Sequence, residues 1–182
     1  NIDAWWPHVE AGVEAIVVTA SGCGVQVRDY GHILADDTLY AEKAAKISSL
    51  SRDPSEVLAG EKAALLPLLA ARPERRGKLA FHSPCTLQHG LQIRGSIEVL
   101  LQSAGYDLTP VADSYLCCGS AGTYSVLQPE LAGMLRANKL AALNAGGPAL
   151  AATANIGCLT HLQAGSSLPV RHWIELIDEV LA

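Results

Sequence analysis

The sequence predicts an α/β protein in which parallel sheets are flanked by helices. Short apolar segments alternate with longer helical patterns, as they do in parallel βα units. Hydrophobic residues make up 49% of the 182 residues, which is ample for a packed core. Residues 148–158 also repeat the order of residues 13–23, an apolar run that ends in Thr-Ala and is followed by Gly-Cys. The sequence therefore indicates duplicated βα units.

The first expected strand covers residues 14–19, a compact apolar run typical of a strand buried on both faces. Ser21-Gly22-Cys23-Gly24 interrupts the run, and a helix is expected over residues 25–34. A polar, charged stretch follows over residues 36–78 and is interpreted as a connector between two halves. Within it lie two expected helices, residues 40–50 and 61–71, and four punctuating residues, Pro54, Gly60, Pro67 and Pro73. The chain begins at Asn1 without an initiator Met, so we interpret it as a fragment of a longer protein.

The second half has a more regular pattern. A strand over residues 78–82 is followed by a helix over residues 91–104, where apolar residues recur at helical spacing before Gly105. The remaining expected elements are a strand region over residues 107–116, a helix over 129–145, strands over 148–154 and 170–173, and a last helix over 174–181. Pro129 and Gly146-Gly147 are typical of the start and the end of a helix.

The charge pattern excludes some classes of function. The net charge is −5 and the 13 basic residues are scattered, so the sequence indicates no nucleic-acid partner, for which phosphate neutralisation supplies most of the affinity. No stretch approaches the roughly 20 apolar residues that a transmembrane segment needs. A secretory signal is also missing from the sequence. We therefore expect a cytoplasmic protein.

The cysteines carry the chemistry. There are five, at positions Cys23, Cys85, Cys117, Cys118 and Cys158. An odd number in such a chain indicates metal or redox use and not a disulfide framework. Each locus follows an expected strand, and the carboxyl ends of parallel strands lie along one edge of a sheet, where ligands collect. Helix N-termini at that edge favour thiolates. We therefore expect distant cysteines to converge on one site.

The adjacent pair Cys117-Cys118 requires an irregular turn. Neighbouring side chains on a strand point to opposite faces, so both can bind one metal site only where the strand is broken. Gly119, Ser120, Ala121 and Gly122 follow the pair, and the glycines permit such a turn. Small residues there also leave room for inorganic sulfide.

The spacing of these cysteines resembles the cysteine-rich "CCG" domain family. Cys85 is separated by 31 residues from Cys117-Cys118-Gly119, and 38 residues then precede Cys158-Leu-Thr-His161. The family occurs in heterodisulfide reductase subunits, lactate-utilisation proteins and iron–sulfur subunits of glycolate oxidases, usually as two copies. The resemblance implies a remnant of the first copy over residues 1–35, a helical connector over 36–78 and a complete second copy over 79–182. Cys23 then belongs to the closing motif of the first copy.

Three stretches are similar to the glycolate oxidase branch of the family: residues 81–90, 154–163 and 169–176. This similarity implies an electron-transfer subunit of a glycolate oxidase or dehydrogenase. Such a subunit passes electrons from flavin-containing subunits to a respiratory electron acceptor. The chain would be part of an oxidoreductase, although the fragment alone is not expected to be catalytic. The resemblance also implies a cytoplasmic location, peripheral to the inner membrane through the complex.

The resemblance implies an iron–sulfur cluster of the [4Fe–4S] type, held by Cys85, Cys117, Cys118 and Cys158. His161 stands where the family pattern has its last cysteine, and Val25-Gln26 replaces the equivalent position after Cys23. His161 is a candidate ligand, because imidazole can replace thiolate on iron or complete a Cys₃His zinc site. Cys23 is a candidate for the cofactor-binding set. His82 and His89 flank Cys85 and are interpreted as packing residues, with hydrogen bonding to the cluster as the alternative.

Other functions stay open on the sequence alone. The site could be a catalytic thiol–disulfide centre like that of heterodisulfide reductases, or the chain could belong to the lactate-utilisation branch. It could also be a structural module, with zinc or without metal, that docks the flavin subunit. The isolated fragment could lack a cluster.

Overall fold

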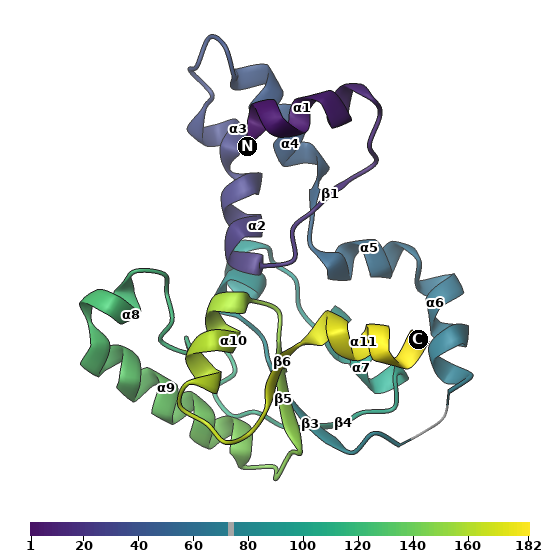
Figure 1. Cartoon of the computed structure of the whole chain (residues 1–182), viewed down its shortest axis with the longest axis vertical. Coiled ribbons are helices and arrows are strands. Elements are labelled where there is room, and N and C mark those ends of the chain that lie inside the picture. Colours follow the sequence, from purple (N-terminus) through teal and green to yellow (C-terminus); the bar gives the residue numbers. More distant parts are fainter. Residues whose placement is uncertain (73–74) are drawn as a thin grey trace.

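The chain contains two parallel sheets in a computed structural model that describes residues 1–72 and 75–182 (Figure 1). The larger sheet has the strand order β4-β3-β5-β6 and every neighbouring pair is parallel. Its strands are β3 (Lys78–His82), β4 (Asp107–Thr109), β5 (Leu150–Thr153) and β6 (Val170–His172). The smaller sheet pairs β1 (Ile16–Val17) with β2 (Ser51–Arg52). The expected α/β class with parallel sheets flanked by helices is confirmed.

Helices surround both sheets. They are α1 (Ile2–Glu10), α2 (Ser21–Arg28), α3 (Tyr30–Ile33), α4 (Ala41–Leu50), α5 (Pro54–Gly60), α6 (Lys62–Ala70), the π-helix η1 (Thr86–Gly90), α7 (Ser96–Ser103), α8 (Tyr124–Leu127), α9 (Pro129–Asn144), α10 (Ile156–Gln163) and α11 (Trp173–Leu181). Pro73, one of the residues expected to punctuate the connector over 36–78, lies outside the described residues.

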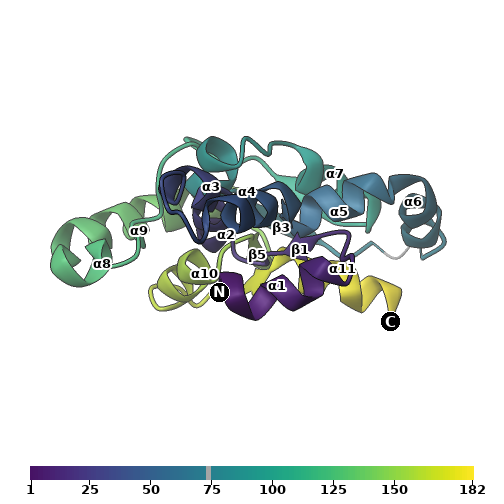
Figure 2. The ribbon, with the colours of Figure 1, turned by 90° about the horizontal axis from the view of Figure 1, so that it is seen from above.

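The larger sheet separates two hydrophobic cores because side chains alternate between the faces of a strand. Leu79 and Phe81 of β3 lie in one core with residues of α6, α7 and α11. Ala80 points to the other face, where it lies in a core with Leu140 of α9 and Leu162 of α10. Figure 1 shows α9 and α10 on one side of the sheet and α7 and α11 on the other. In Figure 2 α8 and the start of α9 extend beyond the rest of the molecule.

Several elements differ in length from their sequence-based bounds. The strand expected over residues 107–116 ends at Thr109, because Pro110 has no N–H to continue the ladder and Asp113 then takes a positive φ of 47°. The helix expected over residues 25–34 begins earlier, at Ser21, and is divided at Asp29 into α2 and α3. The helix expected over residues 91–104 begins only at Ser96.

Two parts of the chain have the same order of elements. In β1-α2 and in β5-α10 a short strand leads to a helix whose first turn contains Gly-Cys, with Cys23 in one and Cys158 in the other. The chain then returns to a parallel neighbour, β2 or β6, and enters α5 or α11. Asp53 caps α5 by accepting a hydrogen bond from the Ser55 N–H, and the His172 ring nitrogen Nδ1 accepts from the first turn of α11. The strand–helix repeat noted in the sequence therefore has a counterpart in the topology.

The start of α2 contacts the carboxyl edge of the larger sheet. The Ser21 N–H donates to the Ala154 carbonyl at 3.2 Å, and the Ser21 and Thr86 hydroxyls are 2.7 Å apart. His172 Nε2 lies 2.9 Å from the carbonyl oxygen of Thr19. These contacts join the β1-α2 segment to the end of the sheet where the cysteine loops lie.

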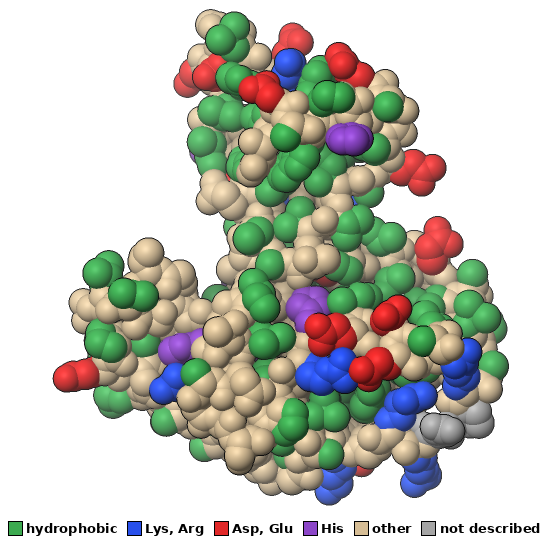
Figure 3. All heavy atoms as spheres, viewed as in Figure 1, with side chains coloured by type: hydrophobic (Ala, Val, Ile, Leu, Met, Phe, Trp, Pro, Cys, Tyr) green, Lys and Arg blue, Asp and Glu red, His purple; other side chains and the backbone are tan. Residues whose placement is uncertain are grey.

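Charged side chains are unevenly distributed over the face shown in Figure 3. Acidic side chains lie over the upper part of this view, near α1, α3 and α4, and again beside α11, whereas most of the basic side chains lie in its lower half. Over residues 1–72 and 75–182, the chain forms no helix with the combination of length and apolarity needed to cross a bilayer.

Candidate metal centre

Four of the five cysteines lie on loops at the carboxyl edge of the larger sheet. Cys85 follows β3, Cys117 and Cys118 lie in the loop after β4, and Cys158 lies in the first turn of α10 after β5. Cys118 and Cys158 are buried, at 1% and 7% exposure, whereas Cys85 and Cys117 are partly exposed. All five cysteines are free thiols.

Hydrogen bonds hold these loops in place. The Gln88 side-chain amide donates to the carbonyl oxygen of Ser83 at 2.7 Å and to that of Ser114 at 3.0 Å. It thereby ties the loop of Cys85 to the loop that leads to Cys117. The Asn155 side chain accepts from the Gly157 N–H at 2.8 Å and caps α10. Cys158 is thus fixed at a helix N-terminus, where the helix dipole favours a thiolate.

The turn after the cysteine pair depends on Gly119. Its φ of +93° lies in the region that favours glycine, and its N–H donates to the Cys117 sulfur at 3.3 Å. A Cβ at this position would lie 2.5 Å from the Ala132 carbonyl oxygen of α9. The close approach of the turn to α9 brings Cys118 into the core between the sheet and α9. This is the irregular turn that the adjacent cysteines were expected to need.

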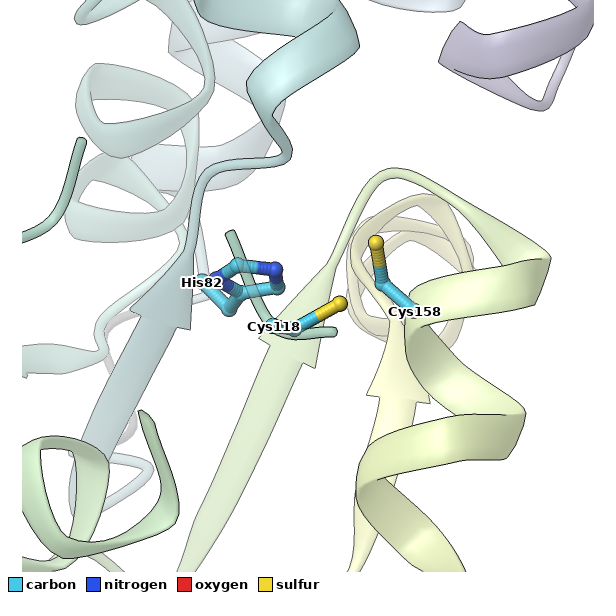
Figure 4. A group of neighbouring side chains, drawn as sticks. All are labelled: His82, Cys118 and Cys158. Atoms are coloured by element: carbon cyan, nitrogen blue, oxygen red, sulfur yellow. The ribbon is translucent and has the colours of Figure 1, made fainter. Parts of the chain in front are cut away.

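His82 joins two of the cysteines. One of its ring nitrogens and the sulfur atoms of Cys118 and Cys158 lie within 4.8 Å of one another, and all three residues are buried (Figure 4). His82 is the last residue of β3 and follows Ala80 by two positions, so its side chain projects toward the same face of the sheet. That face carries the core of Ala80, Cys118 and Cys158. Figure 4 shows the imidazole beside the two sulfur atoms.

The site contains buried polar atoms without a hydrogen-bond partner. Among the described residues, neither ring nitrogen of His82 makes a hydrogen bond, and the hydroxyl of Thr153 makes none either. His82 and Thr153 are neighbours in the β3–β5 register. An unpaired buried polar group costs about 1–3 kcal/mol, so two such residues beside a group of thiols require an explanation. Thiolate and imidazole together are the ligands of iron–sulfur and zinc sites, and the donor set therefore fits a metal or cluster.

The four thiols alter one another's protonation. The pKa of Cys117 is lowered to about 2, first by a hydrogen bond from the Cys118 thiol and then by one from Cys85. The pKa of Cys158 is lowered to about 6, chiefly by a hydrogen bond from Cys118 and further by the neighbouring His82 ring. The pKa values of Cys85 and Cys118 are raised, in both cases chiefly by Cys117. These hydrogen bonds therefore favour the ionised form of Cys117 and Cys158 and the protonated form of Cys85 and Cys118.

Lys139 supplies positive charge close to the cysteine pair. It lies on α9, is 3% exposed, and donates from Nζ to the carbonyl oxygen of Asp113 at 2.8 Å. Burial lowers the pKa of Lys139, while Cys118, Asp113 and Cys117 act in the opposite direction and favour its charged form. This cation offsets the negative charge that ionised thiols bring into the core.

Two predicted site residues lie apart from this group. His161 belongs to α10, but its Nε2 is 3.3 Å from the Ala132 carbonyl oxygen, and the side chain lines a hollow with Ser120 and Thr160. Cys23 is exposed and lies in a groove formed by β1, α2 and Trp5. The structure thus brings Cys85, Cys117, Cys118 and Cys158 together, and brings neither His161 nor Cys23 into the group with His82.

Sequence reasoning gave too little weight to one residue at this site and missed another. His82 was interpreted as a packing residue, although the alternation of β3 places it on the cysteine face. Lys139 was not singled out, because a single lysine in a helical pattern is usually solvent-exposed. Lys139 differs from an ordinary surface lysine only in its hydrogen bond to the Asp113 carbonyl. Asp113 lies in a loop without regular structure, and no sequence pattern predicts that contact.

Comparisons with known proteins give consistent results. Residues 79–163 match the cysteine-rich domain family named CCG. The "Glycolate oxidase iron-sulfur subunit" of Escherichia coli is 52% identical over 181 residues, which are 100% of this chain and 43% of that protein. The "Probable glycolate oxidase iron-sulfur subunit" of Bacillus subtilis is 30% identical, over 84% of this chain and 34% of that protein. "Lactate utilization protein A" of Shouchella clausii is 23% identical, over 92% of this chain and 71% of that protein.

The chain spans less than half the length of the first two of these relatives. The matched domain covers β3 to α10 and so includes all four converging cysteines. Residues 79–163 are therefore similar to the CCG cysteine-rich domain family, and over its whole length the chain is similar to part of the glycolate oxidase iron–sulfur subunit of E. coli.

Proposed function

We propose that the chain is part of an iron–sulfur electron-transfer subunit of a glycolate oxidase or dehydrogenase. The observation that carries this proposal is the convergence of four thiols and a buried, unpaired imidazole at one edge of a parallel sheet. Identity to the E. coli subunit, at 52%, is far above the 23% to a lactate utilisation protein and supports the glycolate branch.

In this proposal Cys85, Cys117, Cys118 and Cys158 hold a cluster of the [4Fe–4S] type. An iron–sulfur cluster, when bound, supplies one-electron transfer. The protein's own residues prepare the site. Cys158 lies in the first turn of α10, where the helix dipole favours a thiolate, and Lys139 on α9 offsets the negative charge of the thiolates. The partial exposure of Cys85 and Cys117 leaves one side of the site open to an electron donor or acceptor.

The proposal extends to the organisation of the longer protein. Residues 79–182 form a complete CCG copy, residues 36–78 connect it, and residues 1–35 end a preceding copy to which Cys23 belongs. The similar order of elements in β1-α2-β2-α5 and β5-α10-β6-α11 supports this division. Flavin-containing subunits would donate electrons, and a respiratory acceptor would receive them, on the cytoplasmic side of the inner membrane.

The test is the content of iron, acid-labile sulfide and zinc per chain after anaerobic reconstitution. We expect iron with matching sulfide in the wild type. Cys117→Ser should lose most of both, because a hydroxyl is a weaker ligand than a thiolate, while the metal-free fold is retained in the circular dichroism spectrum.

Cys23→Ser is the matched control, since Cys23 is exposed and lies apart from the other thiols. It should retain the wild-type iron content. Zinc alone in the wild type would replace the relay with a structural zinc site. If Cys117→Ser contained as much iron as the wild type, the assignment of Cys117 and Cys118 as cluster ligands would be wrong.

A further inference from the structure

We infer that His82 is a metal ligand, and that its ring nitrogen binds the same metal ion as Cys118 and Cys158. The inference rests on the proposed function in that the metal is taken to be iron. It departs from the [4Fe–4S] type, because each tetrahedral iron of such a cluster has three sulfides and one protein ligand and has no room for three side chains. It makes His82 the nitrogen ligand, in place of His161, which the sequence pattern made a candidate.

The first support is the state of the imidazole. His82 is 2% exposed, and among the described residues both of its ring nitrogens lack a hydrogen-bond partner. A buried histidine that serves only for packing normally pairs at least one nitrogen with a carbonyl, hydroxyl or carboxylate. A metal ion would satisfy one nitrogen directly and repay the desolvation cost of the ring.

The second support is geometry. The three donor atoms lie within 4.8 Å of one another. Bond lengths near 2.3 Å for sulfur and 2.0–2.1 Å for nitrogen place two donors of one tetrahedral ion about 3.5–3.8 Å apart. Side-chain adjustments of roughly an ångström therefore suffice to close the three donors around one ion.

The third support is the origin of each donor. His82 ends β3, Cys118 directly precedes the turn at Gly119, and Cys158 lies in the first turn of α10 (Figure 4). A strand end, a turn fixed against α9 and a capped helix hold their side chains from three directions. Such a tripod on rigid elements is what a metal site of defined geometry needs.

His161 is held differently. Its Nε2 contacts the Ala132 carbonyl oxygen, and its side chain is partly exposed in a hollow next to α8 and α10. Turning this ring toward the thiols would break that contact. Of the two histidines, His82 has a ring nitrogen that is unpaired within the described part of the chain and lies in the core with the cysteines, whereas His161 is engaged outside that core.

The decisive experiment compares His82→Leu with His161→Leu in the reconstituted, reduced protein. Pulsed electron paramagnetic resonance with ¹⁵N-histidine labelling detects a nitrogen bound to the cluster. We expect the nitrogen coupling in the wild type and in His161→Leu, and its loss in His82→Leu. Coupling that survives in His82→Leu and disappears in His161→Leu would overturn the inference.

A second measurement uses cobalt(II) and does not depend on iron. His82→Leu should weaken cobalt binding to the metal-free protein by more than about 100-fold, beyond the 10–100-fold typical of a residue that only contacts a ligand. His161→Leu should leave the affinity within about threefold of wild type, because its ring is bound to α9. Equal affinities for the two variants would overturn the inference.

Stability separates a ligand from a structural residue. In the metal-free protein Leu replaces an unpaired polar ring by an apolar group, so His82→Leu should unfold at the same urea concentration as wild type or a higher one. A marked loss of metal-free stability would mean that the ring is structural and would overturn the inference. Absence of iron uptake by the wild type, with cobalt binding still dependent on His82, would instead overturn the proposed function and leave His82 a ligand.

Discussion

At the scale of single residues, the site is a hydrogen-bonded series of four thiols in which groups that favour ionisation alternate with groups that favour the protonated form. Cys117 and Cys158 have lowered pKa values, and Cys85 and Cys118, which donate hydrogen bonds to them, have raised ones. Each thiolate is thus stabilised by a neighbouring thiol that remains protonated. The metal-free site is held together by the same side chains that a metal would join.

This arrangement predicts how many protons leave when metal binds. Ligands bind in their deprotonated form, so at about pH 7.5 loading should release about two protons, from Cys85 and Cys118. Below pH 6 the Cys158 thiol is also protonated, because its pKa is about 6, and the release should rise to about three. Calorimetry of zinc binding in buffers of different ionisation enthalpy measures the number.

The lowered pKa of Cys158 also makes the stability of the metal-free fold depend on pH. A lowered pKa means that Cys158 stabilises the metal-free fold above its ordinary pKa of about 8.5, and that this contribution is lost as the pH falls through about 6. In Cys158→Ser the change in proton release near pH 6 should disappear. A release of about four protons at neutral pH in the wild type would contradict the ionised state of Cys117 and Cys158.

The sequence specified the cysteines of this site better than its histidine. Spacing alone grouped Cys85, Cys117, Cys118 and Cys158, because each follows a strand of one parallel sheet. His161 became a candidate ligand through its place in a sequence pattern. The position of His82 depends instead on the two-residue alternation of β3 and on which face α9 and α10 cover. That choice of face is a property of the packing and is not encoded next to the cysteines.

At the scale of elements, the Cys-Cys-Gly turn is the most constrained part of the site. We expect Gly119→Ala to destabilise the metal-free protein by roughly 2–4 kcal/mol, through a positive φ and through a Cβ placed 2.5 Å from the Ala132 carbonyl. Iron uptake should fall with it, because the turn places Cys117 and Cys118. Urea unfolding and iron analysis measure the two effects.

Gly122 provides the control in the same loop. Its φ is +60°, but a Cβ there meets nothing within 4 Å, so Gly122→Ala should cost only about 1–2 kcal/mol from the backbone conformation. Iron uptake in that variant should stay near the wild-type level. Equal costs for the two variants would mean that the contact with α9 contributes nothing.

The long helix α9 and the short strands β3 and β6 were predictable from the sequence, whereas η1 and β2 were not. Residues 129–145 were expected to be helical and α9 covers Pro129–Asn144, because Pro, Gly and apolar spacing mark such a helix. The π-helix η1 has five residues and the strand β2 has two, which is too short for a periodic apolar pattern to indicate either element. Their conformation is set by tertiary contacts, such as the bond from the Gln88 side chain to Ser114, which no local signal announces.

At the scale of the whole molecule, the β1-α2 segment is fitted against the edge of the larger sheet. A Cβ on Gly90 would lie 2.4 Å from the Val25 side chain, so α2 and η1 approach each other only because Gly90 has none. We expect Gly90→Ala to lower the free energy of unfolding by about 1–3 kcal/mol through this overpacking.

The compensating change identifies the cause. Val25→Ala in the Gly90→Ala background removes the side chain that clashes, so it should restore most of the lost stability, and a double-mutant cycle of urea unfolding should show the coupling. Additive losses in the double variant would contradict a direct contact between α2 and η1.

The strand order β4-β3-β5-β6 has a consequence for the timing of assembly in the cell. Cys85, Cys117 and Cys118 leave the ribosome well before β5, yet the last sulfur atom reaches them only when β5 has paired with β3 and α10 has formed behind it. In a nascent chain the thiols of Cys85, Cys117 and Cys118 are therefore exposed before the metal site is complete. We expect metal to bind only after nearly the whole domain has left the ribosome. Until then the exposed thiols are most susceptible to oxidation.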